Sequence, residues 1–144
     1  MLINDVIDKL KSILDSLTGS GQPLVSVFDW ANPDPQQFPC LLIGIADGGV
    51  KEGRLDSADN EFEAVFVLEL LMKQELTRDS YRQRNDILNQ VLAALRTFQN
   101  YDTLDGTVEK MGVADFRMFH ENGADAPRVG FDLFVRIVKI EPLG

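Results

Sequence analysis

Few side chains in this sequence belong to the types that perform catalysis or bind metal ions. His120 is its one histidine and Cys40 its one cysteine, and they lie far apart in different kinds of segment. A lone histidine without an acidic or cysteine partner at ligand spacing is a weak candidate for a general base or a metal ligand, and a solvated loop residue is the commoner case. Cys40 opens an apolar segment, where a cysteine usually packs as a small hydrophobic residue. Neither residue predicts an active site.

The acidic and glycine-rich segments do not match a known site either. Four acidic residues lie in or beside the polar stretch 47–60, without the alternating ligands and central glycine of a calcium-binding loop: Glu52, Asp56, Asp59 and Glu61. Glycines cluster at 19–21 and 44–49, without the Lys-Ser or Lys-Thr of a phosphate-binding loop and without dinucleotide spacing. We therefore expect a protein that is not an enzyme and that holds no cofactor or metal ion.

Size and composition fit one globular domain spanning residues 1–144. Hydrophobic residues make up 44% of the chain and charged residues 26%, and a single cysteine excludes an internal disulfide framework. No apolar run approaches the roughly 20 residues of a membrane span, and the first residues lack the basic start of a secretory signal. We expect no membrane partner.

The net charge of −9 argues against a protein that grips nucleic acid, because phosphate contacts need clustered Lys and Arg. The simplest role of this charge is solubility. A negative surface would also let DNA pass without sticking, and an acidic surface could mimic a polyanion for a basic partner. Charge alone does not separate these roles.

Hydrophobic periodicity predicts two helices and five strands in the order αβββαββ. The helices cover 2–17 and about 77–98, and the second begins at a Thr77 or Asp79 cap. The strands cover 24–28, 40–45, 61–73, 108–119 and 128–141, with Asn122-Gly123 as the last turn. The segment 40–45 is apolar on both faces and is expected to be a central strand. The predicted fold is α+β, with two helices on a mixed, mainly antiparallel five-stranded sheet.

Two predicted strands have one complete apolar face and one mixed face. The complete faces hold Phe62, Ala64, Phe66, Leu68, Leu70 and Met72 in one strand and Val129, Phe131, Leu133, Val135 and Ile137 in the other. The mixed faces hold Val65, Val67, Leu71, Phe134, Val138 and Ile140 beside charged residues. Monomers rarely expose an apolar strip of this size. Either another molecule covers it, or the first helix or the proline-rich loop does.

A second candidate interface is the polar stretch from Gly48 to Asn60, which is longer than a tight turn needs. It mixes Lys51 and Arg54 with Glu52, Asp56 and Asp59, and we expect a loop that acts as a contact arm. The predicted interface residues are therefore Lys51, Glu52, Arg54, Asp56, Asp59, Val65, Val67, Phe134 and Val138.

The order of segments resembles the tail terminator, or tail-completion, proteins of long-tailed bacteriophages. The features that carry the resemblance are a short N-terminal amphipathic helix, an apolar strand led in by residues 37–43, an acidic loop, the long strand with residues 63–70, a helix with residues 87–95 and a closing hairpin that ends in 135–138. The resemblance covers nearly the whole chain and lies in the architecture, not in particular motifs.

This resemblance implies a virion structural protein that is assembled in the host cytoplasm and located at the tail–head junction. Such proteins form a ring, usually a hexamer, that caps the tail tube and joins it to the head. The implied partners are copies of the chain, the tail tube protein and a head-completion or connector protein, and DNA passes through the lumen without specific binding. The alternative is a soluble acidic binding module, such as an immunity-like inhibitor of a basic partner.

Overall fold

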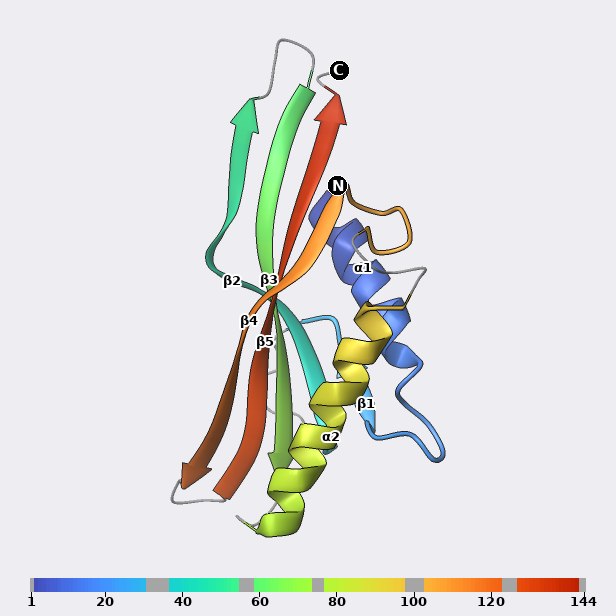
Figure 1. The fold of residues 1–144 in the computed structure, drawn as a ribbon, viewed down its shortest axis with the longest axis vertical. Helices are drawn as coiled ribbons and strands as arrows, with labels where there is room; N and C mark the ends of the chain where they lie inside the picture. Colours follow the sequence, from blue (N-terminus) through green and yellow to red (C-terminus); the bar gives the residue numbers. More distant parts are fainter. Residues whose placement is uncertain are drawn as a thin grey trace.

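Both helices lie on one face of a long, twisted sheet, which extends beyond them at one end (Figure 1). The computed structural model describes residues 2–30, 37–54, 59–73, 77–97, 103–122 and 127–142. The order αβββαββ and the five-stranded mixed sheet confirm the predicted α+β fold. The elements are α1 (Leu2–Asp15), β1 (Ser26–Phe28), β2 (Cys40–Arg54), β3 (Asp59–Lys73), α2 (Arg78–Leu95), β4 (Lys110–Asn122) and β5 (Pro127–Pro142).

Strand β3 lies at the centre of the sheet, in which the strand order is β1-β2-β3-β5-β4. All neighbours pair antiparallel except β1 and β2, which are parallel. Strand β1 covers only Cys40 to Leu42 of β2. The prediction of a central strand at 40–45 is therefore wrong beyond Leu42, where β2 has no described neighbour on its outer side.

The polar stretch 47–60 is mostly a β-hairpin and not the predicted loop. Strand β2 continues to Arg54, which pairs with Asn60, while residues 55–58 lie outside the described residues. Strand β5 runs along the other side of β3 as far as Pro142 and so holds the start of β3 as a strand on which β2 can pair. The glycines that suggested a loop instead mark an irregularity, because residues 46–49 stand opposite Val65 alone.

The ends of the helices follow from local chemistry. Helix α1 ends at Asp15, and Gly19 then takes a φ of 108°, which favours glycine. Helix α2 begins after Thr77, whose hydroxyl accepts from the Ser80 amide at 3.2 Å, while the Ser80 hydroxyl accepts from the Thr77 amide at 3.0 Å. Lys9 of α1 pairs with Asp105 at 2.9 Å and joins the helix to the turn after α2.

The core lies between the helices and one face of the sheet. Phe66 and Phe131 are fully buried at its centre, as their alternating apolar strands predict. The helices contribute Val6, Leu10, Leu14, Ile87, Val91 and Leu95 to the same cluster. Because both helices pack on this face, neither covers the opposite one, and the predicted cover by the first helix is absent.

Among the described residues, only one end of the opposite face is covered. Cys40, Leu42 and Leu71 form a small buried cluster there, packed against Phe28 and Phe38. This confirms Cys40 as a core residue and shows that the segment leading into β2 covers part of the mixed face. The cover stops at Leu71, and the remaining residues of this face form the candidate site.

Candidate interaction surface

The bare face is the part of the sheet opposite the helices that no described residue covers. Its apolar part consists of Val65, Val67, Phe134 and Val138, all partly exposed. The register places Val67 directly beside Phe134, while Val65 lies beside Arg136 and Val138 beside Glu63. The four predicted apolar interface residues are thus brought together on two adjacent strands, as their alternation in sequence required.

An ion pair crosses the apolar part of the bare face. The Arg136 guanidinium contacts Glu63 Oε1 through Nη2 at 2.8 Å and through Nε at 2.9 Å. The hydrogen bond and the negative charge of Glu63 raise the pKa of Arg136 above its usual value. An exposed pair of this kind adds little to stability, but it ties Arg136, whose register partner is Val65, to Glu63, whose register partner is Val138. It therefore shapes the surface.

A second polar row lies across the sheet towards the covered end. Register places Glu69 beside Asp132, and Asp132 beside Arg117. Burial raises the pKa of Asp132, and its hydrogen bond with Glu69 and the charge of Arg117 oppose that shift without cancelling it. The Asp132 Oδ1 atom is buried without a hydrogen-bond partner in the described structure. The Arg117 guanidinium also lies 5.4 Å from the centre of the Phe134 ring, so this row borders the apolar part.

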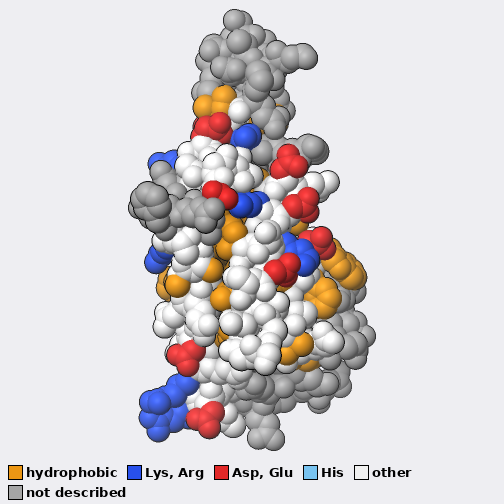
Figure 2. All heavy atoms as spheres, turned by 90° about the vertical axis from the view of Figure 1, so that its right-hand side faces the viewer, with side chains coloured by type: hydrophobic (Ala, Val, Ile, Leu, Met, Phe, Trp, Pro, Cys, Tyr) orange, Lys and Arg blue, Asp and Glu red, His pale blue; other side chains and the backbone are white. Residues whose placement is uncertain are grey.

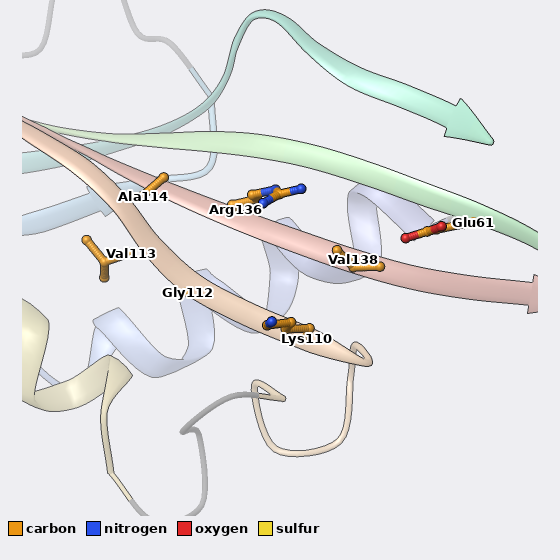
Figure 3. Close-up of a pocket in the computed structure, with 7 residues that line it drawn as sticks. All are labelled: Glu61, Lys110, Gly112, Val113, Ala114, Arg136 and Val138. Carbon is orange, nitrogen blue, oxygen red and sulfur yellow. The ribbon is translucent and has the colours of Figure 1, made fainter.

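A shallow hollow of about 580 Å³ lies beside the bare face, where β4 is irregular (Figure 3). The register shifts between Val113 and Asp115, which leaves Ala114 as an extra residue in β4. Gly112 adds no side chain, and a Cβ atom there would meet nothing within 4 Å. The lining residues are Glu61, Lys110, Gly112, Val113, Ala114, Arg136 and Val138. The hollow thus presents two cations, one carboxylate and small apolar groups.

The other predicted interface residues fall on the hairpin of β2 and β3. Lys51, Glu52 and Arg54 belong to β2, and Asp59 belongs to β3. The structure describes the backbone of these four residues but not their side chains, and Asp56 lies outside the described residues. The backbone shows that this hairpin projects past the helices (Figure 1). The predicted contact arm therefore stays a hypothesis for this segment, but the prediction that the segment is a loop is wrong, because most of it is paired as a β-hairpin.

Sequence reasoning missed the charged rows of the bare face. Glu63 and Arg136 lie on strands far apart in the chain, and Glu69, Asp132 and Arg117 come from three different strands. Alternation alone gave each residue its face. Their mutual contacts required the register between strands, which no local pattern supplies.

His120 and Cys40 remain apart in the structure. His120 belongs to β4, opposite Val129, and not to a loop as predicted, because β4 and β5 stay paired as far as Asn122 and Pro127. Cys40 is fully buried at the start of β2. In the described part of the chain no three His, Cys, Asp or Glu residues gather in a group that could hold a metal ion.

The side of the molecule that carries the helices has an ordinary charge pattern. Basic and acidic side chains alternate among its described residues, without a continuous area of one sign (Figure 2). Neither described helix is long and apolar enough to cross a membrane. A search of family models and of curated proteins found no match to this chain.

Proposed function

We propose that this chain is a self-assembling structural protein of a bacteriophage virion, which forms a ring on the end of the tail tube and joins it to the head. The observation that carries the proposal is the bare face. It is a sheet surface of partly exposed apolar residues crossed by an ordered ion pair. Such a surface suits contact with another protein.

The fold supports the same proposal. Its αβββαββ order is the one on which the resemblance to tail terminator proteins rests. The long hairpin of β2 and β3 extends beyond the helices and is available for contacts along the axis of a tail (Figure 1).

The charge supports the passage of DNA. Six copies at −9 each would carry −54, and a lumen of that sign would repel the phosphate backbone. A protein through which a genome slides has to avoid tight binding, and an acidic ring meets that requirement.

The second candidate is an acidic binding module that covers a basic partner, and the net charge favours it. The two functions differ in what dominates affinity. A module of this kind acts as a monomer or dimer, and salt weakens its binding steeply. A ring protein depends on its apolar surface and shows a defined high-order mass.

The test is assembly on tails made without this chain. Purified protein is added to such tails, alone and with filled heads, and rings are sought by mass measurement and by electron microscopy. We expect a ring on the tail end and infectious particles after head addition. Val67→Lys in the bare face should reduce both the number of rings on tail ends and the number of infectious particles. Ala93→Lys on the exposed side of α2 is the matched control and should reduce neither. Protein that never binds tails and never restores joining would refute the proposal.

A further inference from the structure

The turn that leads from α2 into β4 has an uncommon backbone conformation. Leu104, Asp105 and Gly106 have φ angles of 47°, 56° and 79°, so three consecutive residues lie in the left-handed region. Glycine enters this region without a steric penalty, and aspartate tolerates it better than most residues. Leucine does not, because its Cβ atom crowds the following carbonyl oxygen. The backbone is therefore strained at Leu104, and the surrounding structure has to hold it in place.

The core holds this turn from one side. Leu104 is fully buried and Val108 is 4% exposed, and both belong to the cluster of residues beneath the helices. Two hydrogen bonds close the turn: the Thr107 amide donates to the Leu104 carbonyl at 3.2 Å, and the Val108 amide donates to the Thr103 carbonyl at 3.1 Å. The free energy gained by burying a leucine is similar in size to the cost of its left-handed conformation. The two terms at Leu104 thus nearly offset each other.

Helix α1 and strand β5 hold the turn from outside. Lys9 of α1 pairs with Asp105 at 2.9 Å, and the turn lies beside this helix (Figure 1). The Lys139 ammonium of β5 donates to the Thr107 carbonyl at 2.9 Å. Both side chains of the ion pair are partly exposed, and such pairs add little stability. We call residues 103–109 the clasp, because they join α1 to β5 by these contacts.

The clasp leads directly into the wall of the hollow. Its last residue is Glu109, whose amide donates to the Val138 carbonyl at 3.0 Å and whose carboxylate accepts from the Ile140 amide at 2.9 Å. Strand β4 begins at the next residue, Lys110. Lys110 and Val138 both line the hollow beside the bare face (Figure 3). The clasp therefore holds the first residue of β4 against β5.

We infer that the clasp opens locally, ahead of the rest of the sheet, and that its opening removes Lys110 from the hollow. The left-handed backbone opposes the closed state, and an exposed ion pair and a few hydrogen bonds near the surface contribute little to hold it closed. Segments of this kind open before the strands of a core. The inference does not depend on the proposed ring, so its failure would leave the proposed function standing.

We expect the opening to end at Met111. The Met111 side chain is buried in the core, and its register partner Ile137 is fully buried. Residues 103–110 can therefore separate while the rest of β4 stays paired. The open state leaves Arg136 as the one cation among the residues that line the hollow. A partner that contacts Lys110 in the hollow would favour the closed clasp, because a ligand stabilises the state to which it binds.

The first experiment is amide hydrogen exchange of the full chain, followed by NMR. Lys9→Ala removes the ion pair, so the Val108 and Glu109 amides should exchange about two- to fivefold faster. The Phe66 amide of the central strand β3 should be unaffected. Lys11→Ala is the matched control, because it removes a similar exposed pair, with Asp15 at 2.8 Å, within α1.

Three results of this experiment would contradict the inference. Unchanged exchange of the clasp amides in Lys9→Ala would show that the ion pair does not hold the clasp. An equal acceleration at Phe66 would show that the whole sheet opens at once. An equal effect of Lys11→Ala on the clasp would trace the change to α1 in general.

The second experiment tests the strain. Asp105→Ala and Asp105→Gly both lose the ion pair, but only glycine adopts a φ of 56° without strain. The Val108 and Glu109 amides should therefore exchange about fivefold faster, or more, in Asp105→Ala than in Asp105→Gly. Equal exchange in the two variants would refute the strain.

A second pair of variants repeats this test if either Asp105 variant fails to fold. An added Cβ atom would meet nothing within 4 Å at Gly106 or at Gly112, and only Gly106 has a positive φ. Gly106→Ala should therefore speed exchange of the Val108 and Glu109 amides, and Gly112→Ala is the matched control that should not. The same exchange in both variants would show that the left-handed turn is not strained.

Discussion

Replacement of Phe66 by alanine tests whether the helix face of the sheet is the true core. Phe66 is fully buried, and its register partners are Ile45 and Val135. A phenylalanine side chain buries about 200 Å². At about 25 cal/mol per Å² its removal from water is worth at most about 5 kcal/mol. Partial collapse of the cavity brings the expected loss of unfolding free energy to roughly 3–5 kcal/mol.

The matched control is Phe62→Ala on the same strand and the same face. Phe62 is only partly buried at the margin of the core, so its replacement should cost about half as much. Urea unfolding at one protein concentration measures both, because assembly also shifts apparent stability. With a slope of about 2 kcal/mol per M, the Phe66→Ala midpoint should fall by about 1.5–2.5 M. A fall no larger than that of Phe62→Ala would show that the assigned face or register is wrong.

Three further predictions concern single side chains. Burial raises the pKa of Asp132 in the folded state, so the stability that this carboxyl contributes is full below its unfolded pKa and is lost as pH rises through its folded pKa. Asp132→Asn should therefore have a higher melting temperature than the parent at neutral pH, and the difference should shrink towards about pH 4. The control Glu63→Gln should show no such gain in melting temperature. Thr77→Ala removes the cap of α2 and should cost about 1 kcal/mol in denaturant unfolding. His120→Ala, and Cys40→Ser where it still folds, should leave assembly and joining intact; loss of joining by a stable, correctly assembled His120→Ala ring would revive a catalytic or metal-binding role.

The sequence determined which face each strand residue occupies. Apolar residues at every second position made Phe66 and Phe131 core residues, and successive side chains of a strand point to opposite faces wherever the strand lies. The helical spacing of Val6 and Leu10 likewise fixed the buried side of α1. Such local geometry belongs to the chain itself, and for that reason it could be predicted.

Tertiary structure decided which strands are neighbours, and with it the surface. The contact of Glu63 with Arg136 spans 73 positions and exists only in one register of β3 and β5. The extension of β2 to Arg54 depends on β5, which lies on the far side of β3 and holds its first residues as a strand. Both helices could have divided between the two faces, but they pack on one, and this leaves the bare face open. Strand order likewise makes β4 and the end of β2 edges, because neighbours in a sheet are chosen by long-range packing and not by the local period of the sequence.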